Sequence, residues 1–405
     1  MRTERLRLRV LNFIGYTDDN IPVESEGAVT YVNDPVNGKT IKLNDGTGWV
    51  DAIGAGGPIP SFEINNIGTQ LFGSGVMSNV RASVATVRQY DGTVVPVLAN
   101  EIRIDGARRV DHSDGIMYNA GVLGIEYFDT ESDGTTPISP VPLMLHEPSA
   151  TNHFLNSSSP VTQAIALTNG TYTVWIDDTD SLGSVTLSGG ATGSATAGSP
   201  LTFTNSGSVT FTLSGSNNLR VQVESGSYAT SYIETAGSSV TRDSDAIRNS
   251  DFSNFNQLAG VLAFKFYPGH DSESTTHWPL VSGLDTNAGR ILYNRTTANN
   301  IASFDGSGAP IEVVTAGWSA GDEILAAVVW SDAESLYSIS VSVDGGSTWS
   351  AWDQDSYDGA FEAGTILSFF STYPRLMRIG SCRLYDALTG PTLADSQVWV
   401  EANIT

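Results

Sequence analysis

The chain is poor in cysteine, in basic residues and in charge of either sign, and each shortage excludes a class of protein. Its one cysteine, Cys382, can form neither a disulfide framework nor a cysteine-based zinc site, and we expect it to be a small buried residue of a late strand. Charged residues make up 16% of the 405 residues, too few for a helical bundle or coiled coil. Because 44 acidic residues outnumber 20 basic ones, the net charge of −24 repels nucleic acid, and we expect no nucleic-acid partner.

Long hydrophobic runs are also missing. No stretch approaches the roughly 18 apolar residues of a membrane helix, so we expect no membrane insertion. The first ten residues are basic but carry no apolar run behind them, so we expect no secretory signal. The apolar fraction of 40% is nevertheless too high for a disordered chain.

The pattern that is present is that of β-strands. Apolar and polar residues alternate, with Thr, Val and aromatics enriched, in residues 171–176, 184–188, 208–213 and 219–223. Clusters of Gly, Ser, Asn and Asp separate such segments at roughly 8–12-residue intervals, the spacing of an antiparallel sandwich or barrel. No segment shows a convincing 3.6-residue stripe. The sequence therefore predicts an all-β fold.

The N-terminal region is basic and small. Four arginines lie within its first nine residues, and three of them alternate with leucine: Arg2, Arg5, Arg7 and Arg9. This alternation fits either an ordinary strand with a solvated face or a strand that inserts between acidic neighbours and anchors the molecule in an assembly. Residues 27–52 predict a hairpin around Asn-Gly and Asp-Gly turns. A hairpin of this size buries too little to stand alone, so we expect it to repeat about a symmetry axis or to pack on another surface.

Acidic residues can serve as metal ligands or as catalytic groups. Asp177, Asp178 and Asp180 form either a Ca²⁺ site or a solvated acidic loop, and we expect no resident cofactor. The five histidines lack the spacing of a zinc site. Glycosidases of the concanavalin type carry Glu-x-Asp-x-x-Glu on one strand, and the sequence contains no such run. We therefore expect no enzyme; the alternative is a carbohydrate-active enzyme, either a capsule depolymerase or a glycosidase.

Residues 342–349 fit the Asp-box pattern of sialidase propellers, S/T-x-D-x-G-x-x-W. In this pattern the Asp accepts backbone N–H bonds in a tight hairpin and the Trp packs beneath it. A propeller repeats the pattern in every blade, whereas here it occurs once. We therefore predict a structural hairpin and no sialidase site.

A glycan-binding surface is the remaining chemical possibility. Sugar-binding sandwiches place an aromatic ring under the sugar and polar groups beside it. Candidates in turn-like sequence are Trp278, Trp318, Trp352, Asp353 and Tyr357. The alternative for each aromatic residue is a place in the core, where large rings bury the most area.

Several ordered motifs resemble those of tailed-bacteriophage virion proteins. Residues 81–86 (Arg-Ala-Ser-Val-Ala-Thr) and 147–152 (Glu-Pro-Ser-Ala-Thr-Asn) are similar to a strand and corner common in such proteins. Residues 222–235 and 240–245 match the signature Gln-x-Glu-x-Gly-x-x-Ala-Thr-Ser-Tyr-Ile-x-Thr followed by Val-Thr-Arg-x-x-Asp, which closes a β-sandwich there. One departure is Leu-Met-Leu at 143–145, where the family usually has Leu-Leu-Ile.

The two ends of the chain also carry resemblances. Residues 27–52 are similar to strand-turn-strand modules near the N-termini of phage fibres. Residues 258–405 resemble a concanavalin A/laminin-G-like sandwich: 258–266, 324–330 and 337–343 fit its strands, while 377–385 and 393–397 fit its closing strand and terminal turn.

Together these patterns predict an all-β chain with a small N-terminal hairpin region and two antiparallel β-sandwiches, of jelly-roll or concanavalin A-like type. The expected regions are 1–57 (attachment strand and hairpin), 58–148 (connecting β segment), 149–248 (β-sandwich) and 249–405 (concanavalin A/laminin-G-like sandwich). The resemblance implies a virion structural protein, assembled in the host cytoplasm as a tail fibre, head fibre or decoration protein. We expect a homotrimer, because exposed hairpin edges are safest when paired with neighbours, and we expect other virion proteins as partners. The sandwiches either decorate the particle surface or bind a host-surface glycan.

Overall fold

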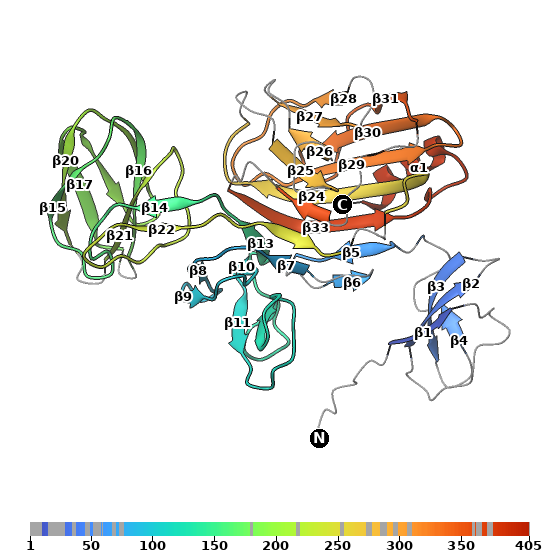
Figure 1. Ribbon diagram of the computed structural model, residues 1–405, viewed down its shortest axis with the longest axis horizontal. Helices are drawn as coiled ribbons and strands as arrows, with labels where there is room; N and C mark the ends of the chain where they lie inside the picture. Colours follow the sequence, from blue (N-terminus) through green and yellow to red (C-terminus); the bar gives the residue numbers. More distant parts are fainter. Residues whose placement is uncertain are drawn as a thin grey trace.

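Strands make up nearly all the regular structure of the chain. The computed structural model describes residues 10–14, 29–34, 38–44, 49–51, 58, 60–66, 70–72, 77–178, 181–215, 219–251, 255–272, 278–283, 290–294, 299–305, 310–358, 361, 367–370 and 376–404. Within these ranges one helix, α1 (Leu393–Asn403), accompanies 33 strands arranged in antiparallel and mixed sheets (Figure 1). The predicted all-β fold class is confirmed.

The N-terminal strands form a four-stranded sheet. Its order is β1 (Val10–Ile14), β2 (Val29–Asp34), β3 (Gly38–Asn44) and β4 (Trp49–Asp51). β2 and β3 pair antiparallel from Val29–Leu43 to Asp34–Gly38, which confirms the predicted hairpin, and β1 lies parallel to β2. The predicted anchoring residues Arg2, Arg5, Arg7 and Arg9 lie outside the described part of the chain.

The middle of the chain folds into a small sandwich. One sheet has the order β15 (Gln163–Ala166), β20 (Ser208–Ser214), β17 (Ser184–Gly189) and β18 (Gly193–Thr196). The other has the order β19 (Leu201–Asn205), β16 (Gly170–Asp177) and β21 (Arg220–Ser225). The alternating segments predicted as strands fall in β16, β17, β20 and β21 and are confirmed. Their inward side chains, including Val174, Val185, Phe211 and Val223, are fully buried between the sheets.

A larger sandwich contains the main core. Its first sheet runs β10 (Arg103–Asp105), β13 (Leu143–His146), β33 (Met377–Tyr385), β24 (Ala259–Pro268), β29 (Ile324–Ser331), β30 (Leu336–Ser342) and β31 (Asp353–Ser356), with β5 (Phe62–Ile64) also on β33 and β6 (Gln70–Phe72) on β5. Its second sheet runs β28 (Ile311–Val314), β27 (Asn300–Ser303), β26 (Arg290–Asn294), β25 (Trp278–Ser282), β32 (Leu367–Phe369), β23 (Ile247–Asn249) and β7 (Met77–Asn79). Phe264, Phe266, Trp330 and Phe369 fill the space between them, and Cys382 is fully buried in β33 as expected.

The segment expected to connect the regions, 58–148, supplies strands to both sheets of this large sandwich. β5, β10 and β13 join the sheet of β33, and β7 joins the sheet of β23. Residues 249–405 therefore do not complete the large sandwich alone. Short added strands cover sheet edges that would otherwise expose unpaired N–H and C=O groups.

Three two-stranded units complete the fold. They are β8 (Ala85–Arg88) with β9 (Val94–Val97), β11 (Arg108–Asp111) with β12 (Ile125–Phe128), and β14 (Ala150–Asn152) with β22 (Val240–Arg242). The β14–β22 pair lies between the small sandwich and the large one, and the β11–β12 hairpin projects from the body (Figure 1).

The helix α1 replaces an expected turn. We expected a terminal turn at 393–397, but these residues form the first half of α1. Thr392 caps the helix by accepting the Asp395 N–H at 3.1 Å. The buried residues of α1 are Leu393, Ser396 and Val400, a sparse face that includes a serine, which explains why the sequence shows no helical stripe.

The Asp-box hairpin is confirmed as a structural device. Asp344 accepts the Thr348 N–H at 2.9 Å and the Ser342 hydroxyl at 2.7 Å. The hydrogen bonds from Thr348 lower the pKa of Asp344 to about 2. Trp349 packs against the apolar cluster beneath the hairpin, on the same face of the first sheet as α1.

Packing between central strands predicts the effect of one substitution. Gly260 of β24 lies opposite Trp330 of β29, and a Cβ at Gly260 would lie 2.4 Å from Cζ2 of Trp330 and 2.6 Å from the Tyr385 carbonyl oxygen. We expect Gly260→Ala to lower the free energy of unfolding by about 1–3 kcal/mol in urea denaturation. Gly237→Ala is the control, because its Cβ would meet nothing within 4 Å. Equal losses from the two variants would contradict this account.

Candidate functional site

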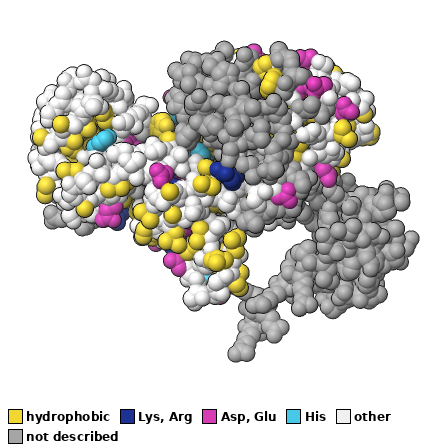
Figure 2. All heavy atoms as spheres, in the orientation of Figure 1, with side chains coloured by type: hydrophobic (Ala, Val, Ile, Leu, Met, Phe, Trp, Pro, Cys, Tyr) yellow, Lys and Arg dark blue, Asp and Glu magenta, His cyan; other side chains and the backbone are white. Residues whose placement is uncertain are grey.

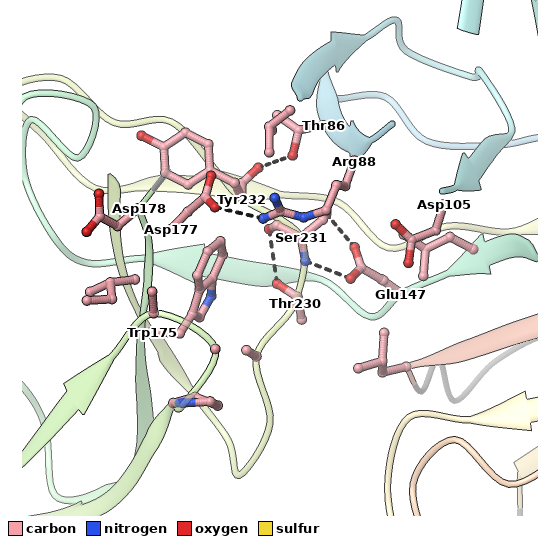
Figure 3. A pocket seen from close by; sticks show the side chains of 18 of the residues that line it. Thr86, Arg88, Asp105, Glu147, Trp175, Asp177, Asp178, Thr230, Ser231 and Tyr232 are labelled. Atoms are coloured by element: carbon pink, nitrogen blue, oxygen red, sulfur yellow. Dashed lines mark hydrogen bonds and ion pairs between the residues drawn. The ribbon is translucent and has the colours of Figure 1, made fainter. Parts of the chain in front are cut away.

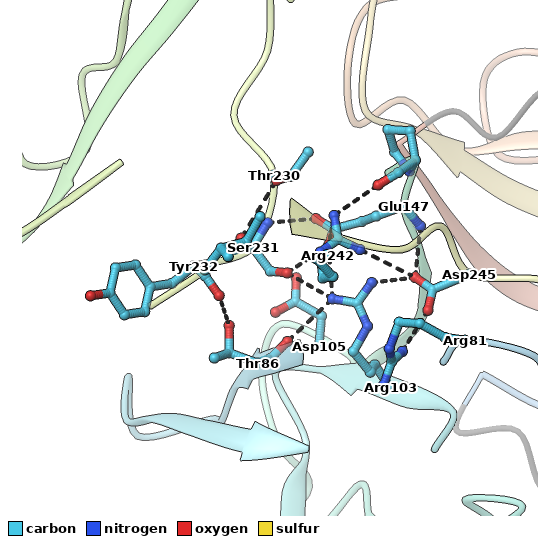
Figure 4. Close-up of polar contacts among 12 residues, drawn as sticks. Arg81, Thr86, Arg103, Asp105, Glu147, Thr230, Ser231, Tyr232, Arg242 and Asp245 are labelled. Carbon is cyan, nitrogen blue, oxygen red and sulfur yellow. Dashed lines mark hydrogen bonds and ion pairs between the residues drawn. The ribbon is translucent and has the colours of Figure 1, made fainter. Parts of the chain in front are cut away.

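Five buried charged residues meet where the small sandwich joins the large one. We call them the ionic cluster: Arg81, Arg103, Glu147, Arg242 and Asp245. Their side chains are between 0% and 2% exposed. They come from separate parts of the chain: the segment after β7, strand β10, the residue after β13, the end of β22 and the segment before β23 (Figure 4).

The two carboxylates of the cluster bridge its three guanidinium groups. Asp245 accepts Arg81 Nη1 at 2.6 Å on one oxygen and Arg103 Nη2 on the other. Glu147 accepts Arg103 Nη1 at 2.7 Å and lies 3.3 Å from Arg242 Nη2. Backbone carbonyls take further guanidinium hydrogens, including that of Leu98 on Arg81 at 2.7 Å. Each carboxylate therefore joins segments that are distant in sequence.

Electrostatics keep both carboxylates ionised despite their burial. Burial alone would raise the pKa of Glu147, but the charges of Arg242 and Arg103 and the Ser231 hydrogen bond lower it to about 2. Burial likewise opposes ionisation of Asp245, and the charges of Arg103, Arg81 and Arg242 hold its pKa well below its usual range. Such a cluster is stable only when complete, because removing one member leaves buried charge unpaired.

The residues of the sequence signature connect this cluster to the small sandwich. Ser231 donates its backbone N–H to Glu147 at 2.7 Å and its hydroxyl at 2.6 Å. Glu224 of β21 accepts the N–H of Thr230 at 2.8 Å, and the Gln222 side chain accepts the N–H of Ile233 at 2.7 Å. The signature residues thus connect the cluster to the small sandwich: side chains of β21 form hydrogen bonds with the segment 230–233, and that segment forms hydrogen bonds with Glu147.

Four of the five residues of the ionic cluster lie in motifs noted in the sequence, but none of the five was predicted as a functional residue. Arg81, Glu147, Arg242 and Asp245 all lie in the motifs that carry the phage resemblance. Arg103 was missed. Its signal is the run Glu101-Ile-Arg-Ile104, in which a scarce basic residue lies between two isoleucines in a strand whose every side chain but that of Asp105 is buried.

A cleft of about 590 Å³ opens beside the cluster, between the small sandwich and the body (Figure 3). Residues from both sides line it, among them Arg88, Asp105, Trp175, Asp177, Ser231 and Arg378. Arg88 of β8 reaches Asp177 of β16 at 3.0 Å, and Asp105 accepts Arg378 Nη2 at 2.7 Å. The cleft therefore combines an indole with paired charges, and its walls belong to different sandwiches.

A second cleft of about 420 Å³ adjoins the first. It shares Arg88, Asp105 and Arg378 with the first cleft and adds Tyr90 and Tyr267. Aromatic rings next to charged hydrogen-bonding groups suit a hydroxyl-rich ligand, since ring faces cover apolar sugar faces and the charged groups bind hydroxyls. None of these lining residues was among the predicted glycan-binding residues.

The predicted glycan-binding residues that the structure describes do not form one surface. Trp318 and Tyr357 are only 5% and 3% exposed and pack in the main core, so neither offers a ring face to a ligand. Trp352 is partly buried and donates its indole N–H to Glu401 of α1 at 2.7 Å. Asp353 is exposed and accepts the Glu312 N–H at 2.9 Å, and the Trp278 side chain lies outside the described part.

The predicted Ca²⁺ ligands have other partners where they are described. Asp177 pairs with Arg88 at 3.0 Å and with Arg220 at 2.9 Å. Asp178 accepts the backbone N–H groups of Leu182 and Gly183. Asp180 lies outside the described residues. Two arginines on Asp177 already supply the positive charge that a cation would bring.

Comparison with known proteins gives weak similarities only. No family model matches the chain, and no curated protein matches it. Among solved structures, the receptor-binding domain of botulinum neurotoxin mosaic serotype C/D has 11% identity and a TM-score of 0.27, over 39% of this chain and 40% of that one. The serotype D binding domain has 11% identity and a TM-score of 0.28, over 39% and 41%. A botulinum neurotoxin type C structure, whose cell entry depends on two ganglioside molecules, has 7% identity and a TM-score of 0.28, over 40% of each chain. Scores this low establish no shared activity.

The helix in the described part of the chain is too short and too polar to cross a membrane.

Proposed function

We propose that the chain is a structural protein of a tailed-phage virion that presents two β-sandwiches as one rigid unit and binds a host-surface glycan in the cleft between them. The observation that carries this proposal is the ionic cluster. Four of its five residues belong to the motifs that resemble phage virion proteins. Its ion pairs join strands of the large sandwich to the end of β22, and hydrogen bonds from Ser231 to Glu147 connect it to the small sandwich. A rigid, multiply presented body suits adhesion, because weak single contacts become avid when many copies share one particle.

Binding rather than catalysis is the proposed use of the cleft. Its four lining carboxylates already have partners: Asp105 pairs with Arg378, Glu147 with Arg103, Asp177 with Arg88, and Asp178 with backbone N–H groups. Glycoside hydrolysis needs a protonated acid and a second free carboxylate across one bond. Carboxylates held in ion pairs serve neither role well, which supports a glycan-binding protein over the alternative of a depolymerase.

The virion role is tested on particles. Antibodies raised against the purified chain should label intact phage particles that encode it, at a fixed position in electron micrographs. Label found only in the soluble fraction of infected cells would overturn the proposal. Incubation of the purified chain with host capsular polysaccharide should release no reducing ends. Release that a single substitution such as Asp177→Asn abolishes would favour the depolymerase.

The glycan cleft is tested by a matched pair of arginines. Arg88 and Arg220 both pair with Asp177, but Arg88 lines the cleft and Arg220 does not. We expect Arg88→Gln to weaken binding of the full chain to polysaccharide extracted from host cells about tenfold, the cost of one charged hydrogen bond. Arg220→Gln should leave the affinity within about twofold. Isothermal titration measures both, and equal affinities of the two variants would place the glycan elsewhere.

A further inference from the structure

Exposed hydrophobic side chains are concentrated in one part of the molecule. Of fourteen large hydrophobic side chains exposed in the described ranges, eight lie between residues 80 and 141, and Figure 2 shows such side chains gathered over the projecting β11–β12 hairpin. Three of them, Ile116, Met117 and Leu123, are 57%, 46% and 60% exposed, and Met117 forms a β-bridge with Leu123. We call these three residues the apolar tip. A group of this kind on a projecting hairpin indicates a contact surface.

The backbone around the apolar tip is firmly held. Gly124 donates its N–H to the Ile116 carbonyl at 2.8 Å and has a φ of +77°. A Cβ at Gly124 would lie 2.5 Å from the His112 carbonyl oxygen, so the turn requires glycine. The Asn119 side chain binds both the N–H and the C=O of Tyr127, at 2.8 and 2.7 Å. The apolar side chains are therefore presented by an ordered hairpin rather than left over from a loose loop.

The hairpin that carries the apolar tip is acidic. Between residues 110 and 141 the chain has no Lys or Arg. Asp111, Asp114 and Glu126 lie within the hairpin, where Asp111 pairs with Arg109 and Glu126 lies 2.8 Å from His112, and three further acids follow β12. The two arginines at the base of the hairpin are engaged, since Arg108 lies over the Phe128 ring at 4.2 Å and Arg109 pairs with Glu101 at 2.8 Å. A partner for this surface must combine apolar and basic side chains.

We propose that the apolar tip docks the N-terminal segment of a second copy, residues 5–9. This segment reads Arg-Leu-Arg-Leu-Arg and belongs to a nine-residue stretch that holds four of the 20 basic residues of the chain. When it is extended, Leu6 and Leu8 lie on one side and the arginines on the other, because side chains alternate along a strand. The leucines cover the apolar tip, and the long arginine side chains reach the flanking acids. The inference deepens the assembly role proposed above and rests on it, although docking can be tested without a virion or a glycan.

The test measures binding of a synthetic peptide of residues 2–11 by fluorescence anisotropy. The receptor is the full chain carrying Arg5→Glu, Arg7→Glu and Arg9→Glu, so that its own segment does not compete. We expect the peptide to bind this receptor and to bind more weakly as salt rises. Adding Ile116→Ser and Leu123→Ser to the receptor should reduce the affinity at least tenfold. Adding Val398→Ser, at a side chain 67% exposed on α1, is the matched control and should leave it unchanged.

Sedimentation of the full chain provides the second readout. The wild type should associate with rising concentration, and both the Arg-to-Glu variant and the Ile116/Leu123 variant should shift toward monomer. Peptide affinity that is equal in the tip and control variants would overturn the proposal. So would association that survives the tip substitutions. Either result would leave the glycan and virion tests above unaffected, so the two proposals fail separately.

Discussion

Replacing Asp245 with asparagine should lower the free energy of unfolding by about 3–5 kcal/mol, the usual cost of removing one partner from a buried ion pair. Asp245 is fully buried, and its two oxygens bind Arg81 at 2.6 Å, Arg103 and the Glu147 backbone N–H at 2.9 Å. Asparagine keeps the shape of the side chain but removes its charge. Its NH₂ group, which cannot accept a hydrogen bond, would face N–H donors that now bind a carboxylate oxygen. Three buried guanidinium groups would then share the single carboxylate of Glu147.

The matched control for this substitution is Asp177→Asn. Asp177 also pairs with two arginines, Arg88 and Arg220, but their side chains are 43% and 37% exposed. Water and salt screen such a pair, so its loss should cost no more than about 1 kcal/mol. Guanidinium denaturation followed by tryptophan fluorescence measures both variants. Because Glu147 of the ionic cluster is hydrogen-bonded to Ser231, in the segment that β21 of the small sandwich holds, Asp245→Asn should also split the unfolding curve into two transitions. A single curve that shifts equally in both variants would contradict the role of the cluster.

The strands of the small sandwich were predictable because each presents one face to the core and one to water. Apolar and polar residues therefore alternate along 171–176 and 208–213. The central strand β29 was also evident, from the unbroken apolar run at 324–330, and all eight residues of the strand are buried. In both cases the signal is local and lies within a single strand.

The strands that complete the large sandwich could not be found in this way. β5 has three residues and pairs with β33. Phe62, near the start of the sequence, therefore lies opposite Leu384, near its end. A strand this short has no measurable period, and its stability comes from the edge it covers. The region expected as a connector is therefore part of the core architecture, a fact set by long-range pairing.

The functional residues show the same difference between features that are local in sequence and features that only the folded chain reveals. The motifs led to Glu147 and Asp245, because charged residues in ordered motifs are visible in sequence, but their burial is not. Two of the aromatic candidates are misplaced for the converse reason. Trp318 and Tyr357 lie in turn-like sequence, yet both are buried, since sequence does not reveal which turns fold back over the core. The cleft residues Arg88 and Trp175 come from different sandwiches and meet only in the folded chain.

Acid should destabilise the chain through the same ionic cluster. The folded-state pKa of Glu147 is lowered to about 2 from an ordinary value of 4.5. A lowered pKa means that the carboxylate contributes stability that is fully present above pH 4.5 and is lost as the pH falls toward 2. For this fully buried group the difference corresponds to about 3 kcal/mol. Asp245 acts in the same direction, because its pKa is lowered further by Arg103, Arg81 and Arg242.

Urea denaturation at pH 7, 5, 3 and 2 measures this effect. Between pH 5 and 2 the wild type should lose about 3 kcal/mol more than Glu147→Gln, which carries no titrating group at this position. Asp133→Asn is the surface control: hydrogen bonds from Thr136 lower the pKa of Asp133 to about 2, but the carboxylate is solvent-exposed. Its pH profile should follow that of the wild type closely. If Glu147→Gln loses stability in acid as steeply as the wild type does, the acid sensitivity arises outside the cluster, and the joint between the sandwiches does not depend on the charge of Glu147.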